Sequence, residues 1–112
     1  MPMKSRSSTT TEKKLQAVHP GEILREEFMA PLNLSANRLA LELRVPVTRV
    51  TEIIHERRAI SPETALRLGR YFNTSPEFWM NLQTSFDLET TRSREQAKVE
   101  RDVQPLVASA HK

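Results

Sequence analysis

The sequence predicts an all-α protein: one domain of five helices that continues into a C-terminal helical extension. Two observations predict this fold class. Apolar residues recur at intervals of three and four along most of the chain, which is the period of an amphipathic helix. The chain also has only two glycines and few runs of β-branched residues, so strand signals are weak. With 112 residues and 38% hydrophobic content, it can build one modest core.

The chain divides into three expected parts. Residues 1–18 are basic and rich in serine and threonine, and they lack hydrophobic periodicity, which predicts a flexible N-terminal arm. Residues 19–88 contain the helical pattern and form the expected domain. Residues 89–112 turn polar and charged, which predicts a helical extension through about Arg101 and a disordered tail after it.

The composition excludes several classes of protein. Cysteine is absent, so disulfides and thiolate zinc sites are excluded and a reducing compartment is favoured. No apolar run approaches about 18 residues, and the basic N-terminus lacks the apolar core of a secretory signal. We therefore expect a cytoplasmic protein. His19 has no second ligand at useful spacing, so we expect neither a metal nor a cofactor.

The first helix is expected from Pro20 to about Met29. The triplet His19-Pro20-Gly21 punctuates its start. Pro31 stops it, because the proline ring clashes with a continued helical turn. Its apolar side is expected to comprise three residues at helical spacing and one just past the helix: Ile23, Leu24, Phe28 and Leu32.

Residues 34–58 predict two short helices with a tight break between them. Ser35 suits the N-cap of the first helix. Arg44 and Val45 carry the break, and Pro46 suits the opening of the second helix, where its missing N–H costs nothing. The expected buried residues are Leu39, Ala40 and Leu43 in the first helix and Val50, Ile53 and Ile54 in the second.

The second of these helices has a polar outer face that can form hydrogen bonds, as in a helix-turn-helix unit that reads DNA. Its diameter matches the major groove. Residues 44–70 carry six arginines against three glutamates, a basic patch in a chain whose net charge is only +3. The candidate DNA-binding residues are Ser35, Asn37, Val47, Thr48, Arg49, Thr51, Glu52, His55, Arg57 and Arg58.

Two roles are expected within this set. Arg49 can bind guanine with two hydrogen bonds, and Thr48 and Thr51 can bond to bases or touch thymine methyl groups. Arg57 and Arg58 follow the reading helix and are expected to contact phosphates. An ordinary helical hairpin inside a small bundle is the alternative that the periodicity alone leaves open.

Two Ser-Pro-Glu triplets, 61–63 and 75–77, open the fourth and fifth helices. Each triplet supplies an N-cap, a proline at the first helical position and an acidic first turn. Gly69, in the middle of the fourth helix, predicts close approach of a neighbouring helix, since alanine would otherwise be better by roughly 1 kcal/mol. The buried face of the fourth helix is expected to contain Ala65, Leu68, Gly69 and Phe72.

The fifth helix, from about Glu77 to Leu88, has more large apolar side chains than one small core should absorb. Trp79, Leu82 and Phe86 share a face, and a two-fold axis lets the same face serve both subunits. We therefore expect a homodimer closed by these residues and by the extension toward Arg101. Packing inside a single core is the competing interpretation, above all for Trp79.

Several motifs together resemble HigA/VapI-type antitoxins, which are helix-turn-helix proteins of the Xre, phage-repressor-like class. The resemblance covers about His19 to Leu88, and its opening and closing motifs are more specific than the helix-turn-helix alone. It implies an antitoxin that neutralises an mRNA-cleaving toxin of the HigB, RelE-like kind. It also implies a nucleoid-associated homodimer that represses its own operon on palindromic operator DNA. The motifs are Pro20-Gly21-Glu22-Ile23-Leu24, the Leu34 to Ile54 unit, Arg57-Arg58-Ala59-Ile60-Ser61, Ala65-Leu66-Arg67-Leu68 and Thr74-Ser75-Pro76-Glu77-Phe78-Trp79-Met80-Asn81-Leu82-Gln83.

The chain departs from the family pattern at three places. Arg44 stands where the turn usually has glycine, and His55-Glu56 stands where the reading helix usually ends in Asn-Gly. Both are places where a left-handed backbone costs about 1 kcal/mol or more for a residue other than glycine. Val47 stands at an outward position that is often polar or basic. It cannot bond to a base but can pack on a thymine methyl group, so relatives do not give the operator sequence.

Three alternatives to the antitoxin remain at this stage. The first is a stand-alone repressor of the same class without a toxin. The second is a protein-binding module that has lost DNA affinity, suggested by Val47 and by acidic Glu52 and Glu56 near the reading face. The third, an enzyme, is the least favoured, because the chain has no cysteine nucleophile, no His-Glu metal cluster and no glycine-rich phosphate loop.

Overall fold

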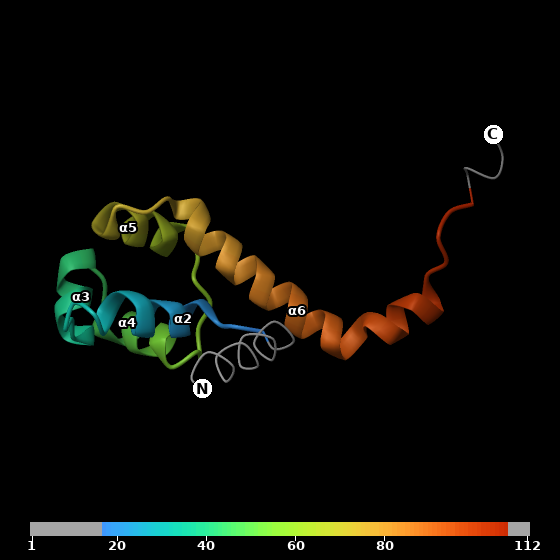
Figure 1. Cartoon of the computed structure of the whole chain (residues 1–112), viewed down its shortest axis with the longest axis horizontal. Helices are drawn as coiled ribbons and strands as arrows, with labels where there is room; N and C mark the ends of the chain where they lie inside the picture. Colours follow the sequence, from blue (N-terminus) through green and yellow to red (C-terminus); the bar gives the residue numbers. More distant parts are fainter. Residues whose placement is uncertain (1–16, 108–112) are drawn as a thin grey trace, which may run out of the picture.

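The computed structural model describes residues 17–107, and these form five helices, as predicted (Figure 1). The first helix has two segments, an α-helical start and a π-helical continuation that the sequence did not predict. The predicted arm, except for its last two residues, and the end of the tail lie outside the described residues. The elements are α2 (Pro20–Ile23), η1 (Leu24–Met29), α3 (Ala36–Leu43), α4 (Val47–Ile54), α5 (Pro62–Phe72) and α6 (Pro76–Asp102).

Hydroxyl caps set the starts of three helices where the sequence places them. The Oγ atoms of Ser35, Ser61 and Ser75 each accept a hydrogen bond from the backbone N–H three residues ahead. This bond satisfies one of the N–H groups that a helix start leaves unpaired. Pro46 differs slightly from the prediction. It is the N-cap of α4 and not its first helical residue, which is Val47.

Within residues 17–107, four residues other than glycine adopt the left-handed backbone, at Asn33, Arg44, Glu56 and Asn73. Arg44 has φ 62° and Glu56 has φ 65°, which confirms the two places where the sequence predicts such strain. At Arg44 the left-handed residue turns its N–H back to the carbonyls of Ala40 and Leu41 and ends α3. The tight break before α4 therefore forms without glycine.

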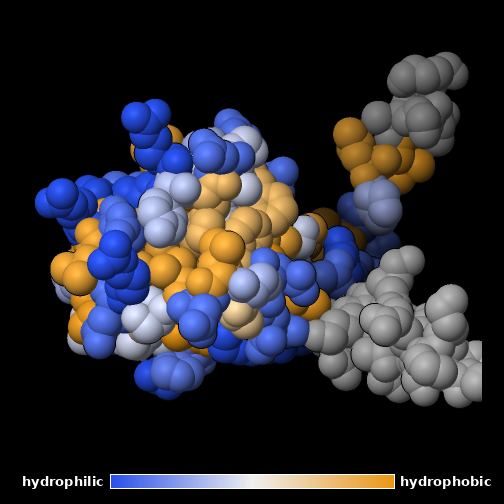
Figure 2. Space-filling view, turned by 60° about the vertical axis from the view of Figure 1, so that its left-hand side comes forward, coloured by the Kyte–Doolittle hydropathy of each residue, from blue (hydrophilic) through white to orange (hydrophobic). Residues whose placement is uncertain are grey.

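The core lies between all five helices and contains the apolar residues expected of α3, α4 and α5. Leu32 is a correction: it lies in the turn after η1 and is 63% exposed, and Met29 is buried instead. Hydrophobic side chains also reach the surface, and Figure 2 shows them gathered on one face of the body between hydrophilic ones. The buried apolar set is Leu24, Met29, Leu39, Ala40, Leu43, Val50, Ile53, Ile54, Ile60, Ala65, Leu68 and Trp79.

Both glycines lie where two segments touch. A Cβ on Gly21 would stand 1.8 Å from the carbonyl oxygen of Ile53, so glycine lets the start of α2 lie against the end of α4. A Cβ on Gly69 would stand 2.9 Å from the carbonyl oxygen of Thr74. The close approach predicted at Gly69 is confirmed, and the neighbour is the turn that leads into α6.

Helix α6 continues through the expected domain boundary at residue 88 without a break. Its first half packs on the body and its second half projects away from it (Figure 1). One residue of the predicted dimer face is corrected here, because Trp79 is 0% exposed and its Nε1 donates to Thr74 Oγ1 at 2.8 Å. Leu82 and Phe86 are half-buried, and Phe86 packs edge-on against His19, with ring centroids 4.8 Å apart. In the described part of the chain, no helix is long and apolar enough to cross a membrane.

Candidate nucleic-acid interface

The outer face of α4 is the candidate reading surface. Val47 is 38% exposed, and Thr48 and His55 are also exposed. Thr51 and Glu52 are half-buried at the margins of this face. The opposite side of the helix is fixed in the core by the predicted stripe of Val50, Ile53 and Ile54. The amphipathic pattern therefore orients α4 as the sequence predicts, with a short row of small side chains facing out.

Two residues of this face already have partners within the protein. Thr51 Oγ1 donates a hydrogen bond to the carbonyl of Thr48 at 3.1 Å, which leaves its lone pairs and methyl group for a ligand. Glu52 forms an ion pair with Arg58 at 3.0 Å. The acidic charge that suggested lost DNA affinity is therefore matched locally by an arginine. Arg58, expected to contact phosphate, lies beside α4 in this pair.

Arg49 lies on the flank of α4 that faces α5. Its Nη1 is 2.9 Å from Oε1 of Glu63, and its side chain is 28% exposed. The guanidinium that is expected to read guanine is therefore directed, in the free protein, to a carboxylate of the protein itself. Glu63 also accepts a 2.7 Å hydrogen bond from Nε of Arg67. Hydrogen bonding from Arg67, with a further bond from Arg49, holds the pKa of the Glu63 carboxyl below its ordinary value.

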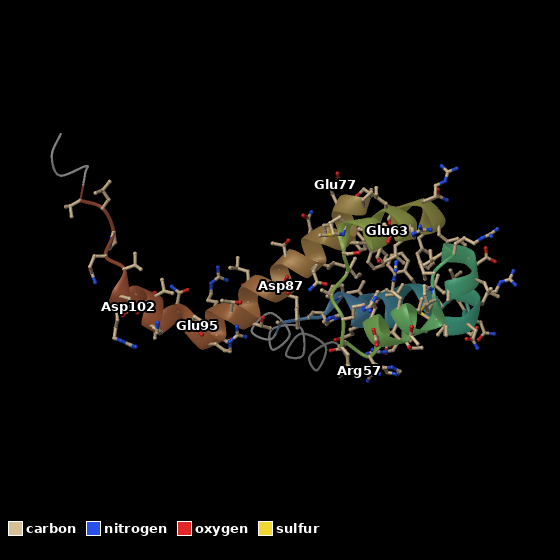
Figure 3. All side chains as sticks on the ribbon, turned by 180° about the vertical axis from the view of Figure 1, so that it is seen from behind. Arg57, Glu63, Glu77, Asp87, Glu95 and Asp102 are labelled. Carbon is tan, nitrogen blue, oxygen red and sulfur yellow. The ribbon has the colours of Figure 1, made fainter. Side chains whose placement is uncertain are left out.

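Other candidates lie around α4. Arg57 occupies the loop between α4 and α5, and Figure 3 shows it at the edge of the molecule. Its side chain is exposed and forms no ion pair with any described residue, so its charge is available to a phosphate. Ser35 and Asn37 are both exposed at the start of α3. The Ser35 hydroxyl accepts from the N–H of Arg38 and keeps its own proton to donate.

Three tertiary contacts position α4 and were not predicted. Arg25 Nη1 donates to the carbonyl of Ile54 at the end of α4, and it also lies 3.6 Å from a Glu56 carboxylate oxygen. Gly21 permits the approach of α2 described above. The loop after α4 is held by Gln83 of α6, whose Oε1 accepts from the N–H of Ile60 at 2.7 Å. Only Gly21 carried a signal in the sequence, because it is one of two glycines and follows proline.

Of the two histidines in the described part of the chain, His19 is buried and His55 is exposed. In the described residues, no three His, Cys, Asp or Glu side chains are grouped closely enough to hold a metal. His19 is 4% exposed, and its Nδ1 accepts from the N–H of Gly21 at 2.8 Å, so it caps α2. Burial lowers the pKa of His19 below its ordinary value, although the charges of Glu56 and Asp87 oppose this shift.

Comparison with known proteins gives three likenesses. A helix-turn-helix family model matches residues 24–79. Virulence-associated protein I of Dichelobacter nodosus is 46% identical over 84 residues, which are 75% of this chain and 78% of that protein. Antitoxin HigA-1 of Vibrio cholerae is 33% identical, covering 86% of this chain and 90% of that one. The solved structure of the Pseudomonas aeruginosa antitoxin HigA with the higBA promoter superposes with a TM-score of 0.81, at 43% identity, over 82% of this chain and 100% of that chain.

Proposed function

Because the chain belongs to the helix-turn-helix family and resembles HigA antitoxins, we propose that it represses its own operon and neutralises a toxin. The toxin class we propose is a HigB-like, RelE-like mRNA-cleaving protein. In this proposal the protein acts in the cytoplasm, associated with the nucleoid. The observation that carries the DNA-binding half is the outer face of α4, where exposed Val47, Thr48 and His55 stand above a buried stripe.

The proposed reading mode uses small side chains. Thr48 bonds to a base edge, and Val47 packs on a thymine methyl group. Arg57 contacts a phosphate beside the groove and positions α4. Arg49 makes no base contact in this scheme, because Glu63 holds it on the α5 side.

Fluorescence anisotropy with the protein's own promoter DNA tests this assignment against a random duplex. Thr48→Ala should weaken binding to the promoter by about 1–3 kcal/mol and leave the random duplex unaffected. Arg57→Ala should weaken both and lower the salt slope by about one unit. Arg101→Ala, a change at an exposed residue near the end of α6, is the matched control for loss of one arginine. Equal binding of the wild-type protein to both duplexes would contradict operator recognition.

We also propose a homodimer, since one helix-turn-helix reads only a few base pairs and useful affinity needs two. Because Trp79 is buried, we propose that the dimer contact lies in the second half of α6, beyond the predicted face. Two shallow hollows, of about 330 and 190 Å³, share Leu88 and Thr91 and continue to Val99. Leu88 is 51% and Val99 is 49% exposed. Leu88, Thr91, Glu95 and Val99 follow helical spacing, so this strip can pair with its copy about a two-fold axis.

The toxin surface we propose is an aromatic patch made of Phe28, Tyr71, Phe72 and Phe78. The rings form a continuous cluster, with centroids of Phe28 and Phe72 4.9 Å apart and those of Tyr71 and Phe72 5.0 Å apart. Tyr71 is 36% and Phe78 is 38% exposed. Exposed aromatic residues are enriched at protein interfaces. The patch contains no residue of α4, so toxin binding there leaves the reading face free.

The charges beside this patch favour a basic toxin. Glu27 and Glu77 are exposed next to Phe28 and Phe78 in the sequence, and neither pairs with a described residue. A second copy of the chain would bring the same carboxylates together, which is unfavourable. Copurification with the product of the neighbouring gene tests the proposal. The double change Tyr71→Ala, Phe78→Ala should release the toxin and preserve promoter binding, whereas Leu106→Ala, a change at an 86% exposed residue beyond α6, should preserve both. Retention of the toxin by the double variant would place its binding site elsewhere.

A further inference from the structure

A chain of charges links the three helices around the reading surface. Arg49 of α4 pairs with Glu63 of α5 at 2.9 Å, and Glu63 pairs with Arg67 at 2.7 Å. Arg67 Nη1 then donates to the carbonyl of Leu43, at the end of α3, at 2.9 Å. One carboxylate therefore holds two guanidinium groups and joins all three helices. No local pattern places Glu63 near Arg49, since fourteen residues separate them.

Glu63 changes what Arg49 can do. An arginine on a reading helix, free to move, binds any phosphate within reach, which adds affinity without sequence information. Paired with Glu63, whose single negative charge it shares with Arg67, Arg49 is partly neutralised and its long side chain is held toward α5. Core packing does not hold Glu63 in place, because its side chain is 54% exposed. Removing its charge is therefore expected to release Arg49 with little effect on packing.

We propose that Glu63 determines specificity by withholding Arg49 from the DNA backbone. This inference rests on the proposed function, in that α4 is the DNA-binding helix. On random DNA the protein shifts along the duplex until a released guanidinium meets a phosphate. On the operator, base contacts fix its position, so the released Arg49 gains less. The pair therefore lowers affinity for random DNA more than affinity for the operator.

Glu63→Gln tests the proposal, with binding measured against promoter DNA and a random duplex over a range of salt. The expected result is a roughly fivefold to tenfold rise in affinity for the random duplex at 0.1 M salt. Its salt slope should steepen by about one unit, as for one added phosphate contact. The ratio of promoter to random affinity should fall accordingly.

Two further variants separate the mechanism from a plain change of net charge. In the Arg49→Ala background, Glu63→Gln should have a much smaller effect, because only Arg67 remains to be released and its guanidinium is still held by the carbonyl of Leu43. Glu42→Gln removes another surface carboxylate, one that pairs with Arg38 at 2.9 Å on α3, and should leave the ratio unchanged. Circular dichroism verifies that each variant is folded.

The outcomes distinguish this inference from the proposed function. Wild-type protein that binds promoter and random DNA equally would overturn operator recognition itself. A wild-type preference for the promoter, together with an equal effect of Glu63→Gln with and without Arg49, would leave operator recognition standing and overturn the role of Glu63. An unchanged affinity of the Glu63→Gln variant for random DNA would also overturn the role of Glu63.

Discussion

The two halves of α6 belong to one continuous helix but are stabilised in different ways. The first half, residues 76–87, buries Trp79 and Gln83 against the body. The second half, residues 88–102, buries no residue and carries pairs between its own side chains, such as Lys98 with Asp102 at 3.3 Å. Tertiary packing therefore holds the first half, while local interactions worth a few tenths of a kcal/mol hold the second. The difference indicates that the first half maintains the fold and that the second half is free to serve contacts with other molecules.

The largest effect is expected at Trp79. Trp79→Ala removes a side chain that is 0% exposed and contacts Phe28, Phe72 and Phe78 through ring stacking. The free energy of unfolding should fall by roughly 3–5 kcal/mol, measured by urea titration. Val99→Ala in the second half should change it by less than about 0.5 kcal/mol. Similar losses from the two changes would abolish the distinction between the halves.

A smaller loss is expected at Gln83. Its Oε1 accepts from the buried N–H of Ile60, and its Nε2 donates to Asp87 at 3.0 Å. Gln83→Leu leaves the Ile60 N–H without a partner, which should cost about 1–3 kcal/mol of unfolding free energy. Gln96→Leu is the matched control, since Gln96 bonds only to exposed Glu100. A Gln83 variant as stable as this control would show that water replaces the bond.

The third effect depends on pH and concerns His19, which packs on Phe86 at the end of the first half. Burial lowers its pKa below 6.5, so between the two pKa values the unfolded chain binds more protons than the folded one. This contribution to stability is complete above the unfolded pKa and is lost as pH falls through the folded pKa. Denaturant midpoints should therefore drop below about pH 6.5. His19→Gln should lose this dependence, while His55→Gln, which changes an exposed residue, should keep it.

The smallest effect on folding is expected at Leu88, where the second half begins. Leu88→Glu places a charge on a residue that is 51% exposed, so the unfolding free energy should change by less than about 0.5 kcal/mol. The same change should disrupt the proposed dimer strip. Analytical ultracentrifugation should show monomer for Leu88→Glu and dimer for Ser93→Glu, a change at an exposed residue that lies off the helical spacing of the strip. A Leu88 variant that remains dimeric would move the dimer contact off the second half of α6.

The sequence alone determined the helices, their starts and the orientation of the reading helix. Serine N-caps, prolines at the first helical position and apolar spacing act within three or four residues, so they can be recognised in the sequence alone. The left-handed backbone at Arg44 and Glu56 was predicted differently, from the resemblance to a family that usually has glycine in these turns. Helical spacing also predicted that Val47, Thr48 and His55 face outward and that the last helix is long, as α6 is, ending at Asp102.

Only the tertiary structure decided which of the singled-out side chains are free. An arginine on an amphipathic helix and a tryptophan in an apolar stripe have the same local pattern whether they face a ligand or the protein itself. Arg49 pairs with Glu63, which is fourteen residues away. Gln83 accepts a hydrogen bond from the N–H of Ile60, which is twenty-three residues away. Trp79 was buried because η1 and α5 supply Phe28 and Phe72 beside it. These partners come from other helices, and packing brings them together at separations that helical periodicity does not encode.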